Sequence, residues 1–183
     1  MAGLIKPVSA LVIVTVVAAI LLGFVHDVTL KAITAQQALS EAEAITSIFE
    51  DRNITSREIS VKEGSPIRRA QEVTSDSGLI GYVFYTSTIG YGGVMNLMIG
   101  IDSSGVIRGV KVLQHSETPG LGTLATIPEY TDQFIGKSGG LVITRASPGD
   151  NEIQAVTGAT ITSSAIVTSV NEALSYFQQM QAR

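Results

Sequence analysis

Residues 81–113 read GYVFYTSTIGYGGVMNLMIGIDSSGVIRGVKVL, and they contain three runs rich in aromatic and β-branched residues. Such residues favour β-strands. The first run ends at Gly90-Tyr91-Gly92-Gly93, and the second ends at the turn signal Asp102-Ser103-Ser104-Gly105. Because the links are short, we expect a meander of three antiparallel strands, at Gly81–Thr88, Val94–Ile101 and Val106–Leu113.

Helical patterns flank this β-rich centre. Residues 28–49 lack Pro and Gly and place apolar residues among Ala, Gln and Glu, which predicts a helical stalk packed on its own domain. Residues 52–76 are polar and predict short strands or loops. Strands in one run with helices at the ends are typical of an α+β domain. The later elements are expected as a short helix, a short strand and a closing helix, at Tyr130–Phe134, Leu141–Thr144 and Ile166–Met180.

The N-terminal segment, residues 1–27, predicts a transmembrane helix. No charged residue occurs from Pro7 to Val25, and a helix of that length reaches about 28 Å, close to the hydrocarbon core of a bilayer. A secretory signal peptide has a shorter apolar region and a cleavage site, and a buried soluble helix has a polar face. Only Lys6 precedes the run, so the positive-inside rule favours a cytoplasmic N-terminus and an exported body. The chain therefore divides into this anchor, a stalk over residues 28–50 and a domain over residues 51–183.

The composition excludes several kinds of chemistry. The 183 residues include no Cys and two His, and the formal net charge is −4. The absence of Cys excludes disulfides, thiolate catalysis, Cys-ligated iron–sulfur clusters and Cys-based zinc sites. No basic run is longer than Arg68-Arg69, whereas nucleic-acid binding needs clustered Lys and Arg. We therefore expect neither a metal site nor a nucleic-acid partner.

A hydroxyl-rich glycine turn precedes the closing helix, over Thr157-Gly158-Ala159-Thr160-Ile161-Thr162-Ser163-Ser164. Free N–H groups and the helix dipole favour an anion at a helix start, and hydroxyls add donors. Gly158 removes a side chain that would keep the backbone away from a ligand. Ser and Thr are also good N-caps, so the same residues are equally consistent with a simple tight turn.

A second motif directly follows the third predicted strand, over His115-Ser116-Glu117-Thr118-Pro119-Gly120-Leu121-Gly122. Its proline and glycines restrict the backbone and present Glu117 and Thr118 on a rigid loop, while Leu121 offers an apolar surface for a flat ring. The alternative is a turn that only reverses the chain. A lone His without partners in the sequence is a poor candidate for proton transfer, and we expect no catalytic residue.

The order of these motifs is similar to that of FMN-binding domains. Gly90-Tyr91-Gly92-Gly93, Ile99-Gly100-Ile101-Asp102, the His115–Gly122 loop and the Thr157–Ser163 turn follow one another as they do in that family. With its single N-terminal span, the chain resembles the G subunits of Rnf complexes, the ion-translocating ferredoxin:NAD oxidoreductases. It is similar, less closely, to the C subunits of sodium-pumping NADH:quinone reductases.

The resemblance implies a covalent FMN site. Thr160 would be esterified to the FMN phosphate, and Thr157, Gly158 and Ala159 would shape the turn that a flavin transferase recognises. Thr162 is a further candidate cofactor-binding residue. The family often has Asp three residues before the first Ser or Thr of this motif, where the present chain has Gln154. The isoalloxazine pocket would be lined by Glu117, Thr118, Gly120 and Leu121.

The implied function is that of an electron carrier in a membrane complex. The resemblance places the chain in the cytoplasmic membrane, with its FMN domain on the extracytoplasmic side and with iron–sulfur and flavin subunits as partners. Electron relay would be coupled to movement of Na⁺ or H⁺. The isolated chain should bind flavin without oxidising NADH. Two alternatives remain, namely a stand-alone membrane-anchored FMN protein and a structural, pilin-like subunit, although no Glu lies in the apolar run.

Overall fold

The computed structural model describes the backbone of residues 2–51 and 53–182. The side chains of residues 1–10, 27, 28, 31, 32, 34, 35, 52 and 183 lie outside the description, and this set includes Lys6, Asp27 and the first residues of the predicted span. The chain forms two compact units, Met1–Glu43 and Ala44–Arg183. Each unit is considered by itself.

The first unit consists of most of one helix, α1, which covers Ala2–Phe49. The predicted helix over residues 28–49 is confirmed, and it is continuous with the apolar segment before it. Within the described residues, no helix has a stretch that is both long and apolar enough to cross a bilayer. The helix ends where Glu50 adopts a left-handed backbone conformation, with φ of 54°.

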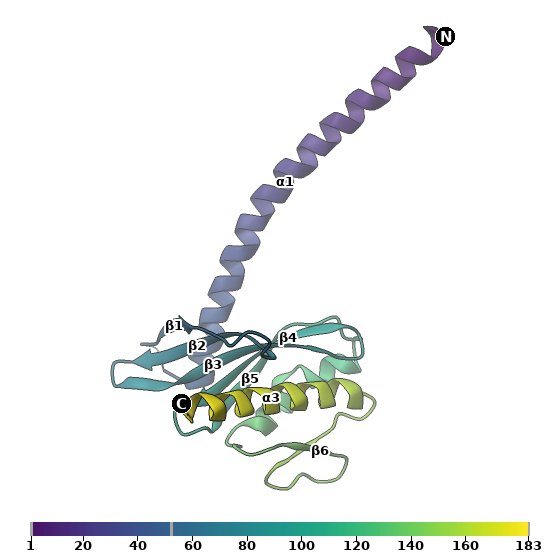
Figure 1. Ribbon diagram of the computed structural model, residues 1–183. Coiled ribbons are helices and arrows are strands. Elements are labelled where there is room, and N and C mark those ends of the chain that lie inside the picture. Colours follow the sequence, from purple (N-terminus) through teal and green to yellow (C-terminus); the bar gives the residue numbers. More distant parts are fainter. Residues whose placement is uncertain (1, 52, 183) are drawn as a thin grey trace. The chain divides into compact units, whose positions relative to one another are not determined.

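The second unit is built on a five-stranded antiparallel sheet in which the strands lie in chain order (Figure 1). The three predicted strands are confirmed within one or two residues at most ends, although the first begins three residues earlier. They are β3 (Gly78–Ile89), β4 (Val94–Asp102) and β5 (Ile107–Gln114). Two further strands, β1 (Thr55–Ile59) and β2 (Ile67–Ser75), extend the meander through the polar region, where short strands or loops were expected. This region reads as polar because β1 is a mostly exposed edge strand and β2 buries only some of its residues.

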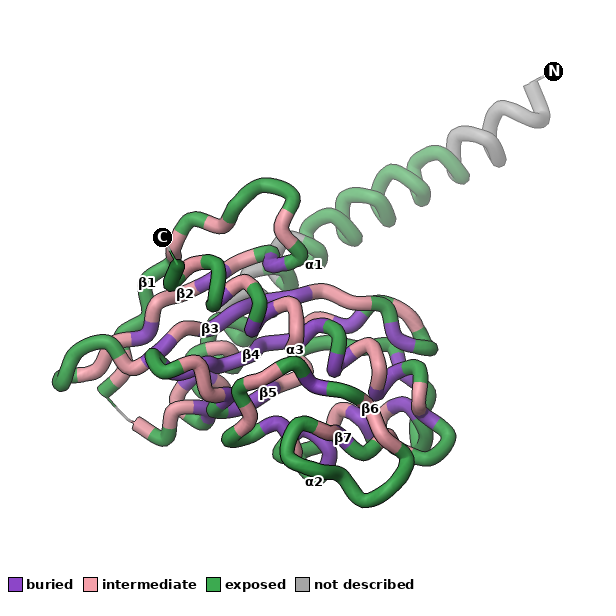
Figure 2. The backbone as a smooth tube through the Cα atoms, turned by 60° about the horizontal axis from the view of Figure 1, so that its bottom comes forward, coloured by how far each residue is buried: buried purple, intermediate pink, exposed green. Residues whose placement is uncertain are grey.

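One face of the sheet is covered by the closing helix α3, Thr160–Gln181. It buries one side against β3 and β4, and the ring of Phe84 meets that of Tyr176 edge to face at 5.8 Å between centroids. Buried residues concentrate along β3 and β4, as the coloured tube shows (Figure 2). The main apolar core of the unit therefore lies between α3 and the sheet.

The opposite face packs against the last residues of α1 that belong to this unit. Ile45 and Ile48 are buried against side chains of β2, β3 and β4. Gly100 and Gly109 face each other across β4 and β5, and a Cβ atom on Gly100 would lie 2.3 Å from Cγ2 of Ile48. The two glycines therefore create the space that Ile48 fills.

Short elements connect the sheet to α3. They are η1 (Gly122–Ala125), α2 (Pro128–Thr131), η2 (Asp132–Phe134) and a parallel pair of three-residue strands, β6 (Val142–Thr144) and β7 (Glu152–Gln154). The predicted short helix and short strand are confirmed. The prediction missed β7, because three residues carry little periodic signal. It also placed the start of α3 six residues too late, because the Ser- and Thr-rich first turns read as a turn rather than a helix.

Candidate functional site

The hydroxyl-rich segment forms a glycine turn that enters α3. Gly158 has φ of 81°, in the left-handed region that favours glycine. Ala159 occupies the N-cap position and no side-chain hydrogen bond caps the helix, so the interpretation of these hydroxyls as N-caps is wrong. Thr160 is the first helical residue, and no hydrogen-bond partner for its hydroxyl occurs among the described residues. The turn therefore presents an uncapped helix start with an unpaired hydroxyl.

A cavity of about 370 Å³ opens beside this turn. It gathers residues from three segments that are distant in sequence, namely the Tyr91 loop, the loop after β5 and the first turn of α3. Every site residue predicted from the sequence lines it, apart from Thr157 and Gly120, which lie in the same two loops. The lining residues are Tyr91, Glu117, Thr118, Leu121, Gly122, Gly158, Ala159, Thr160, Ile161 and Thr162.

Three lining residues were not among the predicted site residues. Gly122 closes the second motif, and Tyr91 stands within a glycine motif that had been used only for the family resemblance. Ile161 lies between the two threonines and is 59% exposed, and Tyr91 is 73% exposed. Large exposed apolar side chains beside a cavity are a signal of a binding site, but exposure is not readable from the sequence. Together with Leu121 they give the cavity apolar surfaces suited to a flat ring.

Glu117 lies at the back of the cavity with its side chain buried, 5% exposed. One carboxylate oxygen accepts a hydrogen bond from the Gly92 amide at 3.1 Å, and the other accepts one from the Thr162 hydroxyl at 2.9 Å. No cation pairs with it among the described residues. A buried carboxylate must be satisfied in this way, because leaving it without partners costs several kcal/mol, on the order of 3.

Glycines make room for this carboxylate. A Cβ atom on Gly90 would lie 2.1 Å from Glu117 Oε1, and one on Gly122 would lie 2.0 Å from Oε2. A Cβ on Gly92 would meet the backbone of Ser116 at 2.2 Å. The glycines of both motifs therefore allow the two loops to approach each other closely around the buried Glu117 side chain.

Further contacts hold the turn through Ser163, which does not line the cavity. The amide of Val156 donates to Ser163 Oγ at 3.1 Å, and the buried Tyr130 hydroxyl donates to the carbonyl of Ser163 at 3.1 Å. Burial raises the pKa of Tyr130 to about 12. Gln133 accepts from the amide of Gln154 at 2.8 Å and donates to its carbonyl. Gln154 thus lies at the end of β7 with its backbone fixed and its side chain exposed.

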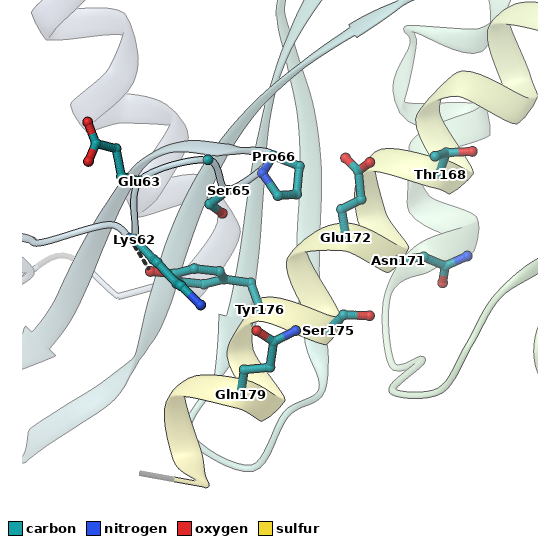
Figure 3. A pocket seen from close by; sticks show the side chains of 11 residues that line it. Lys62, Glu63, Ser65, Pro66, Thr168, Asn171, Glu172, Ser175, Tyr176 and Gln179 are labelled. Carbon is teal, nitrogen blue, oxygen red and sulfur yellow. Dashed lines mark hydrogen bonds between the residues drawn. The ribbon is translucent and has the colours of Figure 1, made fainter.

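A larger depression, of about 550 Å³, lies elsewhere, between the loop of residues 62–66 and the outer face of α3 (Figure 3). The Tyr176 hydroxyl accepts a hydrogen bond from the Lys62 amide there, and Asn171 is bonded to both the amide and the carbonyl of Leu141. These polar groups are occupied by structural contacts. Within the described part of the chain, no group of three or more His, Cys, Asp or Glu is arranged to hold a metal ion.

Comparison with known proteins agrees with this geometry. Residues 90–175 match the family model of the FMN-binding domain. The G subunit of the ion-translocating oxidoreductase complex of Methanosarcina acetivorans is 32% identical over 177 residues, which cover 93% of each chain. The G subunit of the Na⁺-translocating ferredoxin:NAD⁺ oxidoreductase complex of Acetobacterium woodii is 32% identical, covering 84% of this chain and 77% of that one. A crystal structure of NqrC from Shewanella oneidensis superposes with a TM-score of 0.54 at 25% identity, covering 70% of each chain.

Proposed function

Because the chain belongs to the family of G subunits of ion-translocating oxidoreductase complexes, we propose that it relays electrons in such a complex through FMN esterified to Thr160. The complex is a membrane ferredoxin:NAD oxidoreductase that couples electron transfer to the movement of Na⁺ or H⁺. The observation that carries the attachment is the position of Thr160. Its unpaired hydroxyl stands at the uncapped start of α3 and lines a cavity within the matched FMN-binding domain.

The residues present fit a flavin phosphate. Among the described residues, no Lys or Arg lines the cavity, so the negative charge would be stabilised by backbone N–H groups of the first turn of α3 and by the helix dipole. A Cβ on Gly158 would lie 3.3 Å from Leu121, which keeps the turn close to the apolar wall. Thr160 would be the residue that fixes the cofactor, through a phosphoester formed by a flavin transferase. The bond from Thr160 Oγ1 to the FMN phosphorus would form as the phosphoanhydride bond of a flavin dinucleotide donor breaks. The nucleoside monophosphate would leave, and the hydroxyl proton would be released.

The apolar surfaces suit the flavin ring. Tyr91, Leu121 and Ile161 present large side chains at the cavity, each at least half exposed. When bound, FMN supplies the electron chemistry, and the protein supplies position and electrostatics. An open site with a covalent link retains the cofactor while leaving part of it accessible to redox partners.

The membrane anchor and the partners are part of the same proposal. Residues 7–25 carry no charge, and the large apolar side chains described between Leu11 and Val25 are all half or more exposed. Such a surface is stable in lipid. With Lys6 as the only charge before it, we place the N-terminus in the cytoplasm and the FMN domain on the extracytoplasmic side. Iron–sulfur and flavin subunits of the complex would supply the ferredoxin and NAD chemistry.

The attachment is tested by intact mass and in-gel flavin fluorescence after denaturation. The chain is coexpressed with a flavin transferase, either unaltered or as Thr160→Ala or Thr160→Ser. We expect the unaltered protein and T160S, which keeps a hydroxyl, to gain the mass of FMN less one water and to fluoresce. T160A should do neither.

Three outcomes would contradict parts of the proposal. Covalent flavin on T160A would place the bond elsewhere, and flavin released by denaturation would make the site non-covalent. Purification from membranes without other redox subunits would favour the stand-alone FMN protein instead.

A further inference from the structure

The buried Glu117 side chain links three segments that meet at the cavity. It joins the glycine loop at Gly92, its own loop after β5, and the first turn of α3 at Thr162. Its partner Thr162 is fully buried, at 0% exposed. Each carboxylate oxygen accepts one of these hydrogen bonds, so the carboxylate is anchored to two separate segments of the protein.

The helical geometry connects this contact to Thr160. Successive residues of an α-helix are rotated by about 100°, so side chains two positions apart point in nearly opposite directions. Fixing the Thr162 hydroxyl on the buried side therefore turns Thr160 toward the cavity mouth. Consistent with this, Thr162 is buried whereas Thr160 is only half-buried.

The start of α3 needs such a contact. Its N-cap residue is Ala159, whose side chain has no acceptor for the free N–H groups, and an uncapped first turn frays. Ser163 secures the turn. The buried bond between Thr162 and Glu117 is a second contact that holds the same turn.

We propose that Glu117 is a positioning residue for the attachment site: through Thr162 and Gly92 it orders the first turn of α3 and holds the Thr160 hydroxyl toward the incoming phosphate. This inference rests on the proposed attachment of FMN to Thr160. It assigns Thr162 a role through Glu117 rather than through direct contact with the cofactor.

The test compares four full-length variants in detergent with the unaltered chain, and the fourth is Glu117→Gln. Thr162→Val replaces the donor hydroxyl with a methyl group of similar size, and Thr162→Ser keeps a hydroxyl. Thr168→Val is the matched control, since it makes the same change at an exposed position of α3. Two quantities are measured before and during flavin addition. The first is the initial rate of flavin incorporation by a purified transferase. The second, measured before flavin is added, is the hydrogen exchange of amides 163–166, which donate to the carbonyls of residues 159–162 at the start of α3.

We expect Thr162→Val to slow incorporation about tenfold, as the loss of a hydrogen bond to a charged group allows. The same variant should speed the hydrogen exchange of amides 163–166. Thr162→Ser and Thr168→Val should behave like the unaltered chain. Glu117→Gln, whose amide can still pair with both partners, should keep most of the incorporation rate. If Thr162→Val fails to fold, Thr162→Ala removes the same hydroxyl without placing a methyl group against the carboxylate.

Two results would overturn the proposal. In the first, Thr162→Val either incorporates flavin at the normal rate, or incorporates it more slowly while its hydrogen exchange is unchanged. Either way, ordering of the first turn of α3 is not the role of the Thr162 and Glu117 contact. In the second, Glu117→Gln is as slow as Thr162→Val, so that the negative charge acts directly. An unaltered chain that takes up no flavin would instead refute the attachment, and the exchange of amides 163–166 would still decide whether Glu117 orders the turn.

Discussion

Replacing Gly100 with alanine would drive a methyl group into the side chain of Ile48, on the sheet face opposite α3. The new Cβ would lie 2.3 Å from Ile48 Cγ2, well inside van der Waals contact, so that Ile48 has to move. Overpacking of this kind destabilises a protein by about 1–3 kcal/mol. Ile48 is itself 4% exposed, and its replacement by alanine removes buried groups worth about 2–5 kcal/mol.

The two substitutions should not add. Ile48→Ala empties the space that the methyl group of Gly100→Ala needs, so the double variant should be about as stable as Ile48→Ala alone. This corresponds to a favourable coupling free energy of about 1–3 kcal/mol. Urea unfolding of the full-length variants in detergent, followed by circular dichroism of the sheet, measures each free energy of unfolding.

The control is Gly140→Ala, where a Cβ atom would have nothing within 4 Å, and it should change the free energy of unfolding by less than about 0.5 kcal/mol. The reasoning is refuted if the effects of Gly100→Ala and Ile48→Ala add to within about 0.5 kcal/mol. In that case the glycine is not there to accommodate Ile48.

Two predictions concern pH. The pKa of Tyr130 is raised to about 12 in the folded state, above its ordinary 10. The folded state therefore holds the proton more tightly, and the free energy of unfolding should fall as pH rises from about 10 toward 12. Urea unfolding at pH 9–11 should show that Tyr130→Phe lacks this part of the decline and also loses about 1 kcal/mol from the hydrogen bond to Ser163. The pKa of Asp102 is affected first by burial, which raises it, but hydrogen bonds from Ser104 and Val106 and the charge of Arg108 lower it overall, below 3.8. The contribution of Asp102 to the free energy of unfolding is therefore present above its ordinary pKa and lost as pH falls through the lower folded value. Asp102→Asn should reduce the decline of stability at acid pH. An unchanged decline would show that Asp102 does not cause it.

Local sequence patterns were sufficient to predict much of this protein. Runs of aromatic and β-branched residues separated by glycine turns predicted β3, β4 and β5, because strand propensity and turn chemistry act over a few residues. The same locality let the family resemblance single out Thr160 as a candidate, since the glycine and the hydroxyls of the motif are neighbours in the chain. For β7 and for the first turns of α3 the local signal was too short or pointed to a turn, and the prediction missed them.

Only the tertiary structure showed what the glycines and Glu117 do. In the sequence Glu117 was a polar residue on a loop, expected to line the isoalloxazine pocket. In the fold its carboxylate is buried and bonded to Gly92 and Thr162, which are 25 and 45 residues away in the chain. Likewise, Gly100 matters because Ile48 reaches it from another element. Periodicity and propensity describe a residue's neighbours along the chain, whereas burial, close approach and hydrogen-bond partners arise when distant segments pack together.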